Sequence, residues 1–373
     1  MNDHAPRLNA VIDDIASAAG PEGISRSDAR SAFRAFGAAG LFETCPTSAS
    51  ENVTYQSVVK GGVERFSLLG RSSVPLGLSL GLAAHYSAFI APLHFFELDS
   101  TGLEVRALAT RGELIGAHGT TETGSGSRSF ELQSRLDGVP GEFPVLTGNK
   151  DWITNALVAD MALVQARTGD DGGMMGLSSA LVSLDVANGV HRAEYPADPL
   201  PGSNLGRLEF NDSQVSGLVD GAGKGGAVFM IAMDCERIVM YEVLRVWAER
   251  RLRELILELR QRRRGTMKLT SNDVVRHRLA RAQMELDLAG AAVRHVCAAD
   301  LRLPPYDGTS ERVKVMIARA VQLTVDELVE IGGADWYLRG ISGALMEQAT
   351  AARFMSGPND VLMSNYARHS GIK

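Results

Sequence analysis

Cysteine is scarce in this chain of 373 residues, and an excess of positive charge is lacking. The chain has an odd number of cysteines, Cys45, Cys235 and Cys297, and they show no CxxC or Cys/His ligand spacing. This pattern argues against a disulfide framework and a structural zinc site. A reducing cytoplasm is therefore the expected location. The formal net charge of −6 leaves no surplus of lysine and arginine for phosphates, so a nucleic-acid-binding protein is disfavoured.

An ordinary secretory signal is also lacking, because the N-terminus "MNDHAPRLNAVIDD" has no basic region followed by an apolar run. The most apolar stretch, "SVPLGLSLGLAAHYSAFIAPL" from Ser73, is long enough to cross a membrane, but Ser, His, Pro and Gly interrupt it. We expect a buried core helix there and no membrane span. Hydrophobic residues at 45% and charged residues at 22% are typical of a soluble globular protein.

The pattern of apolar residues changes twice along the chain. Residues 1–114 show helical spacing, residues 115–220 show short β-type runs between turn residues, and residues 221–373 show long helical runs. These three segments predict a helical N-terminal domain, a compact β-rich middle domain and a C-terminal bundle of long helices. The expected fold class is α+β, mainly α.

The C-terminal segment carries signals for three long helices. No Gly or Pro occurs from Ala227 to Arg264, which permits one unusually long helix. A second helix is expected after Ser271-Asn272, and a third after "DGTSERVKV", ending at Gly332-Gly333. The stretch "RQRRRGTMK" from Arg260 is a basic patch that suits either a solvated helix end or a phosphate group.

Common cofactor and metal motifs are weak or missing. "GAGKGG" at Gly221 satisfies GxGxxG, but it follows a poor strand and precedes a long helix without a further strand, so an entry loop is favoured over a dinucleotide site. No Walker sequence and no HExxH occur, and no metal site is expected.

Two polar loops in the middle segment are candidates for ligand binding. "TTETGSGSRSF" from Thr120 offers hydroxyl and backbone donors that suit an anionic or heteroaromatic ligand, although a solvent-exposed turn has the same composition. "GNKDWITNA" from Gly148 places Trp152 beside Thr154. A buried structural tryptophan is the alternative there.

One carboxylate interrupts the apolar stripe of the first long helix. That stripe comprises Phe229, Ala232, Met233, Met240, Val243, Leu244 and Trp247. Glu236 falls on it, and loss of hydration there raises the pKa of a carboxyl group and makes it a candidate proton acceptor near neutral pH. The alternative is a buried Glu236 paired with an arginine such as Arg237.

Taken together, these motifs resemble the acyl-CoA dehydrogenase family of flavoproteins. The resemblance implies a helical N-terminal domain, a small β-barrel-like middle domain and a C-terminal four-helix bundle. "TTETGSGS" resembles the family's T-E-x-G-x-G-S loop, which implies that Thr121 and Ser127 contact the flavin, with Ser127 also near the substrate. "GNKDWIT" resembles the G-x-K-x-W-I-T segment, which implies that Trp152 and Thr154 lie against the isoalloxazine ring of FAD.

The same resemblance extends through the long helices. "DCERIV" is similar to the D-x-x-R start of the family's long bundle helix, which implies that Asp234 and Arg237 line the thioester arm of the substrate. Arg262 and the pair Gly332 and Gly333 match residues that, in the family, contact the FAD of a neighbouring subunit. The resemblance therefore implies a homotetramer or homodimer.

The catalytic base expected of the family is displaced in this sequence. Most members carry it in a C-terminal Y-E-G-T motif, but the matching stretch "MSGPND" has Ser356 at the Glu and Pro358 at the Thr. Isovaleryl and long-chain members hold the base one residue before the D-x-x-R arginine, which is Glu236 here. Asp360 resembles a polar position near the adenine end of FAD. Other departures are Arg128, the Gly265-Thr266 pair and Val329.

The resemblance implies an FAD-dependent dehydrogenase that forms an α,β double bond in an acyl thioester of coenzyme A or a carrier protein. Electrons would pass to an electron-transfer flavoprotein or to oxygen. One alternative is a flavin monooxygenase on the same fold, similar to the amino-sugar nitrososynthases. Another is a non-catalytic binding or assembly member, which the missing Y-E-G-T carboxylate suggests.

Overall fold

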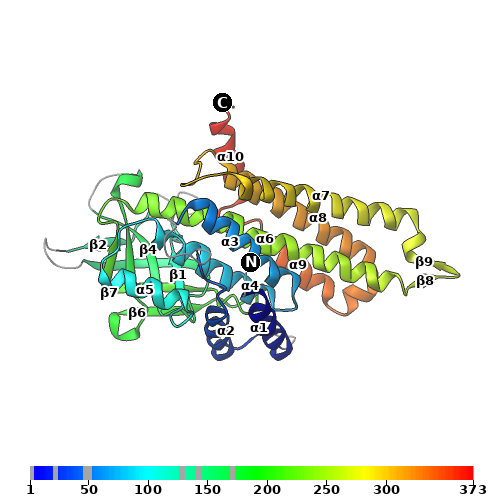
Figure 1. Ribbon diagram of the computed structural model, residues 1–373, viewed down its shortest axis with the longest axis horizontal. Coiled ribbons are helices and arrows are strands. Elements are labelled where there is room, and N and C mark those ends of the chain that lie inside the picture. Colours follow the sequence, from blue (N-terminus) through cyan, green and yellow to red (C-terminus); the bar gives the residue numbers. More distant parts are fainter. Residues whose placement is uncertain are drawn as a thin grey trace.

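The computed structural model describes residues 4–19, 24–44, 53–125, 131–138, 144–168 and 173–372. A small sheet lies at one end of the molecule, and long helices extend from it to the opposite end (Figure 1). The predicted fold class, α+β and mainly α, is confirmed. The N-terminal helices are α1 (His4–Ala18), α2 (Arg26–Ala38), α3 (Tyr55–Arg71), α4 (Leu76–Ala84) and α5 (Ser100–Thr110).

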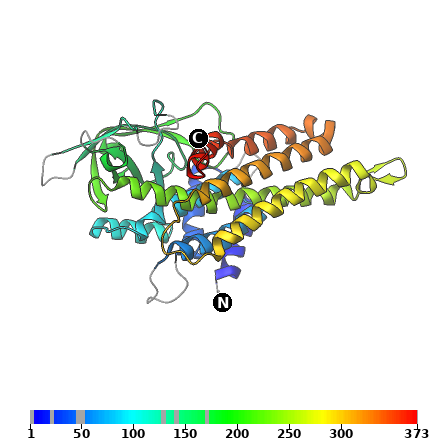
Figure 2. The same cartoon turned by 90° about the horizontal axis from the view of Figure 1, so that it is seen from above.

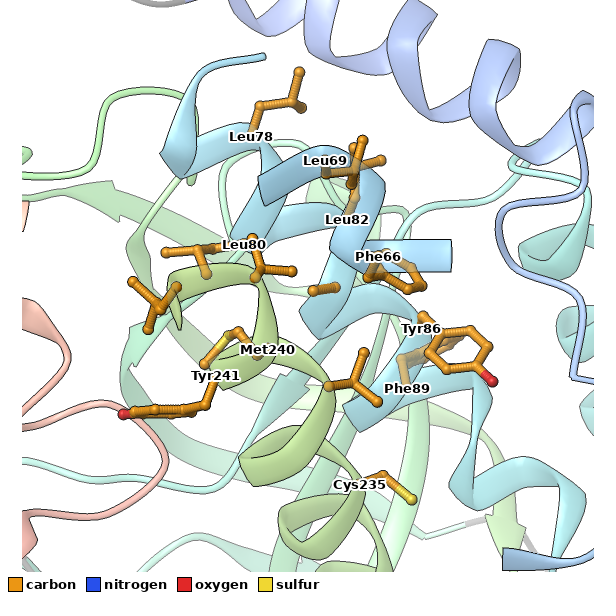
Figure 3. Close-up of a cluster of buried hydrophobic side chains, with 14 of the residues drawn as sticks. Phe66, Leu69, Leu78, Leu80, Leu82, Tyr86, Phe89, Cys235, Met240 and Tyr241 are labelled. Atoms are coloured by element: carbon orange, nitrogen blue, oxygen red, sulfur yellow. The ribbon is translucent and has the colours of Figure 1, made fainter. Parts of the chain in front are cut away.

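The most apolar stretch of the sequence forms the centre of the core. Helix α4 continues into a π-helical segment, His85–Ile90, and the helical stretch Leu76–His94, although long and apolar enough for a membrane, is wholly buried within the fold. Its side chains interleave with those of α3 and of the long helix α6 (Gly225–Leu259), as Figure 3 shows. The predicted core helix is confirmed.

The middle segment forms a sheet that closes on itself. Its strands are β1 (Gly116–Gly119), β2 (Arg135–Asp137), β3 (Val145–Ile153), β4 (Met161–Arg167), β5 (Leu177–Ser183), β6 (Val190–Glu194) and β7 (Gly206–Val219). The order is β1-β4-β2-β3-β7-β5, and an additional β4–β5 pairing joins the ends of the circuit β4-β2-β3-β7-β5. Closure of this kind removes exposed strand edges and produces the predicted barrel-like unit.

The long helix α6 spans the molecule from the sheet to the far end of the bundle (Figures 1 and 2). At its start, a Cβ on Gly225 would lie 2.4 Å from the Ser178 carbonyl carbon of β5. The glycine cluster therefore allows close contact between helix and sheet, as expected for an entry loop rather than a dinucleotide site. The predicted long helix is confirmed, and it ends at Leu259, before the basic patch.

A short hairpin and four further helices complete the bundle. The hairpin, β8 (Arg263–Arg264) and β9 (Met267–Lys268), turns at Gly265, whose φ is 62°. The helices are α7 (Asp273–Ala298), α8 (Thr309–Leu338), α9 (Ile341–Ala351) and α10 (Asn359–His369). Asn272 caps α7 as expected, and α8 breaks at Gly333, whose φ of 63° and ψ of −152° lie in a region reserved for glycine.

Candidate active site

Two loops at one rim of the sheet are joined by the buried side chain of Asp151. Its backbone N–H donates to the Thr121 carbonyl at 2.8 Å, and its Oδ2 accepts a hydrogen bond from the Thr123 N–H at 3.0 Å. Its Oδ1 accepts from Arg207 Nε at 2.6 Å and from the Tyr195 hydroxyl at 3.2 Å. The two predicted ligand-binding motifs therefore lie side by side.

A buried ion pair supports the same rim. Lys150 and Glu122 are almost fully buried, and Lys150 Nζ lies 2.6 Å from Glu122 Oε1. The Glu122 carboxylate also accepts hydrogen bonds from the backbone of Gln133 and from the backbone and hydroxyl of Ser134. Burial lowers the pKa of Lys150 to about 8, and the Glu122 charge opposes that shift. The pair ties the Thr121 loop to β3.

Trp152 lies near the end of β3 with its side chain turned outward. The residue is 53% exposed, so the alternative of a buried structural tryptophan is wrong. Its φ is 57°, a left-handed conformation that bulky residues rarely adopt. The backbone N–H of Trp152 donates to the Tyr195 hydroxyl at 2.8 Å, which helps to hold this conformation. Such strain is concentrated at ligand-binding and catalytic positions.

The sheet contacts α6 close to these loops. The rings of His118 in β1 and Phe229 in α6 have centroids 6.5 Å apart, and His118 Nε2 lies 3.2 Å from the Thr120 hydroxyl. Burial, with the nearby Lys150 charge, lowers the pKa of His118 to about 4, so its ring is neutral at neutral pH. Glu236 follows Phe229 by seven residues. It therefore lies about 10 Å further along the same helix.

Glu236 is half-buried, and its carboxylate receives a hydrogen bond from the Ser356 hydroxyl. Burial raises its pKa, while the Ser356 hydrogen bond and the Arg237 charge oppose the rise. The alternative of an arginine-paired Glu236 is contradicted, because Arg237 instead lies 3.5 Å from Glu311. Among the described residues, no Lys or Arg is within ion-pair distance of Glu236. The carboxylate is therefore suited to accept a proton near neutral pH.

Asp234 lies in α6, two residues before Glu236, and its side chain is buried. Its carboxylate accepts hydrogen bonds from the Tyr55 hydroxyl at 3.0 Å and from the Ser310 hydroxyl. These bonds orient Asp234 within a polar cluster that continues to Arg237 and Glu311. Contact of Asp234 and Arg237 with a thioester stays a prediction.

Ser356 belongs to a turn that covers residues 352–359, between α9 and α10. Its φ is 52°, and that of Gly357 is 100°. The Tyr241 hydroxyl lies 2.8 Å from the carbonyl oxygens of Ala352 and Met355, and Arg237 Nε donates to the Ser356 carbonyl at 3.1 Å. In sequence Ser356 stands only where the family's base is expected, whereas in space its hydroxyl bonds the Glu236 carboxylate.

Three predicted cofactor residues lie far from Glu236 within one chain. Arg262 follows the end of α6, about 35 Å along the helix from Glu236. Gly332 and Gly333 lie about 30 Å along α8 from Glu311, the ion-pair partner of Arg237. A single chain does not bring these three residues to the rim that carries Thr121 and Trp152.

Two other predicted residues lie elsewhere or outside the described part. Asp360 is exposed in the first turn of α10, where it lines a cavity of about 470 Å³ between α7, α8 and α10. Ser127 lies outside the described residues, as does Arg128, so its predicted contact with flavin and substrate stays a prediction.

The donor set at the rim fits a flat heteroaromatic cofactor. Trp152 offers an exposed ring, and Thr121 and Thr154 offer partly exposed side chains whose hydroxyls make no hydrogen bond to the described residues. Hydroxyl groups can meet the carbonyl and nitrogen edge of an isoalloxazine ring while the indole covers its face. Within the described ranges, no group of three or more His, Cys, Asp or Glu side chains is placed to hold a metal ion.

Comparisons with known proteins match most of this chain. The acyl-CoA dehydrogenase middle domain matches residues 117–213, and the acyl-CoA dehydrogenase C-terminal domain matches residues 223–371. An L-prolyl-[peptidyl-carrier protein] dehydrogenase from Serratia is 31% identical over 320 residues, which cover 82% of this chain and 80% of the relative.

Solved structures with low sequence identity share the fold. An FAD complex of PigA has a TM-score of 0.86 at 20% identity and covers 100% of this chain and 98% of that one. Butyryl-CoA dehydrogenase from Megasphaera elsdenii has a TM-score of 0.85 at 18% identity, with 99% and 98% covered. The domain matches, the Serratia relative and the shared fold together establish that the chain belongs to the acyl-CoA dehydrogenase family.

Proposed function

We propose that the protein is an FAD-dependent dehydrogenase that introduces an α,β double bond into an acyl thioester, with Glu236 as the base. The environment of the Glu236 carboxylate supports this proposal most strongly. It is a half-buried carboxylate with a raised pKa, without a basic ion-pair partner among the described residues, and with one serine hydroxyl bonded to it. This environment favours proton transfer over a structural ion pair.

Bound FAD supplies the acceptor for a hydride. Glu236 removes the proton from the α-carbon of the thioester, and the electron pair of that C–H bond forms the new double bond. The β-hydrogen leaves with its own electron pair. Ser356 holds the carboxylate in position, and the rate depends on placing the base against the α-carbon on the side opposite the hydride acceptor.

The rim residues Thr121, Trp152 and Thr154 are proposed to hold the isoalloxazine, together with Ser127. Arg262, Gly332 and Gly333 are proposed to contact the FAD of a neighbouring subunit, because they are remote from the rim of their own chain. Asp360 is proposed to lie near the adenine end.

Replacing Trp152 with alanine is expected to weaken FAD binding by about 10- to 100-fold, since loss of an aromatic stacking surface costs about 1–3 kcal/mol. The melting temperature of the apoprotein should change little, because the ring is half exposed. Quenching of flavin fluorescence on titration with FAD measures the affinity. Unchanged affinity in the variant would show that the ring does not lie against the cofactor.

We infer that the protein is a homotetramer or homodimer. Large apolar side chains are exposed on the bundle and its hairpin, far from the sheet; they include Leu257, Met267, Val274, Met284, Leu288, Tyr337, Leu338 and Met346. Exposed apolar side chains concentrated on one part of a molecule are typical of protein interfaces. Light scattering should give a mass that is two or four times 39.9 kDa; a stable monomer that retains FAD would contradict the inference.

The substrate is proposed to be carried by a carrier protein rather than by coenzyme A. Support comes from the Serratia relative and from a second L-prolyl-[peptidyl-carrier protein] dehydrogenase, from Pseudomonas fluorescens, which is 26% identical and covers 80% of this chain. Asp234 and Arg237 are proposed to line the arm of either thioester.

Electrons are proposed to pass to an electron-transfer flavoprotein or to oxygen. Both described cysteines, Cys235 and Cys297, are free, which supports a cytoplasmic location.

Anaerobic mixing of the purified protein with carrier-protein and coenzyme A thioesters, including L-prolyl and saturated acyl groups, tests the function. Bleaching of the bound flavin by at least one thioester is expected. Reduction only by an external flavin reductase would instead indicate a monooxygenase. A colourless protein that cannot take up FAD would indicate a non-catalytic member.

A further inference from the structure

We propose that Lys314 is a positioning residue for the base: its buried ammonium group holds the turn at residues 352–359 so that the Ser356 hydroxyl stays on Glu236. This inference rests on the proposed function of Glu236. Lys314 comes from α8, whereas Glu236 belongs to α6 and Ser356 to the turn before α10. Three separate segments are therefore linked in series, because Lys314 contacts the turn and Ser356 of the turn bonds Glu236.

The contacts of Lys314 are concentrated on that turn. Its Nζ lies 2.8 Å from the Gly357 carbonyl oxygen, 2.7 Å from Asn359 Oδ1 and 3.3 Å from the Arg353 carbonyl oxygen. It also lies 5.1 Å from the centre of the Tyr241 ring, which is close enough for a cation–π contact. An ammonium group has three N–H donors. The three donors therefore match three acceptors on both sides of Ser356.

The turn needs such anchors because its backbone is strained. Ser356 has a φ of 52°, and left-handed conformations of this kind persist only where the surroundings enforce them. Tyr241 bonds carbonyl groups on the N-terminal side of Ser356, and Arg237 bonds the carbonyl of Ser356 itself. Lys314 supplies the remaining anchor, on the C-terminal side at Gly357 and Asn359. Figure 3 shows Tyr241 reaching outward from α6, with its hydroxyl directed away from the core cluster.

Burial of this lysine is costly, and its oxygen acceptors and the Tyr241 ring offset the cost without a full negative charge. Lys314 is 0% exposed, and no carboxylate of the described residues lies within ion-pair distance of its Nζ. The charged or titratable groups that face it or its turn are Glu236, Arg237 and Tyr241 from α6 and Glu311 from α8. Burial, and then the Arg237 charge, lowers the pKa of Lys314 to about 7. A methionine would fill the same volume without the desolvation cost, so the bonds of the amine to the turn explain this lysine better than a contribution to stability does.

The protonation state of Lys314 then affects the base. The neutral amine has two donors for three acceptors, so deprotonation leaves one carbonyl or amide oxygen without its bond and loosens the turn. We therefore expect the rate of thioester-driven flavin reduction to fall as the pH rises above about 7. A misplacement of about 1 Å at a catalytic group can cost about 100-fold in rate.

A double-mutant cycle tests the inference. The Lys314→Met variant, with intact fold and FAD content, is expected to reduce its flavin about 10- to 100-fold more slowly than the wild type, and to lose the decline in rate above about pH 7. In a Ser356→Ala background the same substitution should cost no more than about threefold, because the hydroxyl that Lys314 positions is already gone. Hydrogen exchange of peptides from residues 352–359 should be faster in Lys314→Met. An exposed lysine, Lys60, replaced by methionine, is the matched control and should change none of these measurements.

Equal losses in both backgrounds, or a Lys314→Met variant that keeps the rate and pH profile of the wild type, would overturn the inference while leaving the role of Glu236 intact. A wild-type protein whose flavin no thioester bleaches would instead reject the proposed function, and the positioning role with it. The behaviour of the wild type therefore distinguishes the two failures.

Discussion

Replacing Glu236 with glutamine is expected to slow thioester-driven flavin bleaching by about 10²- to 10⁴-fold, the contribution that a positioned base usually makes. Glutamine has almost the same shape and can still accept the hydrogen bond from Ser356 through its carbonyl oxygen. It cannot take up the α-proton. Stopped-flow absorbance under anaerobic conditions measures the rate directly.

Two controls separate chemistry from folding in that experiment. The variant should keep its FAD content and melting temperature, because the substitution removes neither the rim nor an ion pair. Ser356→Ala should slow flavin bleaching less than Glu236→Gln does, since it removes only the partner of the base.

The wild-type rate of bleaching should increase with pH through the Glu236 pKa, because only the carboxylate form accepts a proton. Burial raises the pKa of Glu236, so this increase should occur above the usual carboxylate range. Bleaching by Glu236→Gln at the wild-type rate would reject the assignment.

Glu122→Ala is expected to lower the free energy of unfolding by about 3–5 kcal/mol, the usual cost of leaving one member of a buried ion pair alone. Lys150 is 0% exposed, so its ammonium group would lose its counter-ion without gaining water. Ser134 would also lose an acceptor for its backbone and hydroxyl donors. Urea denaturation of wild type and variant measures the difference, and FAD affinity should fall with it, because Glu122 belongs to the loop that carries Thr121.

A matched comparison uses an exposed ion pair of similar geometry. Arg111 and Glu113 are 2.9 Å apart and half exposed, so Arg111→Ala should lower the free energy of unfolding far less than Glu122→Ala does. Combining Glu122→Leu with Lys150→Met should recover much of the loss, because neither charge is then buried alone. Similar losses for Glu122→Ala and Arg111→Ala would show that the buried pair does not hold the rim together.

The long helices and the core helix could be predicted because their signals are local. A run without Gly or Pro, the Asn272 cap and an uninterrupted apolar stretch each depend on neighbouring residues only. The exact end of α6 could not be predicted, because the basic residues from Arg260 to Arg264 suit a helix as well as a hairpin. The turn at Gly265 decides between them, and its effect depends on strand pairing across the turn.

The site could be predicted only in part. Periodicity placed Glu236 among apolar residues, and the family resemblance gave it a role. Its bond with Ser356 could not be foreseen, because the two residues are 120 positions apart and meet through tertiary packing. Composition alone left open whether Trp152 is buried or exposed, because an unusual φ leaves no trace in composition. Glu122 and Lys150 lie inside the polar loops that begin at Thr120 and Gly148. In the sequence, only their opposite charges indicate that they form a pair.

The role of Glu236 can be tested most directly by following proton removal without hydride transfer. A thioester with two α-hydrogens and no β-hydrogen, such as a 3,3-dimethylbutyryl group on the carrier arm, is incubated with the oxidised holoenzyme in D₂O. If Glu236 is the base, the wild type should exchange the α-hydrogens for deuterium. The Ser356→Ala variant should exchange them more slowly, and the Glu236→Gln variant should not exchange them. Exchange by Glu236→Gln at the wild-type rate would contradict that role.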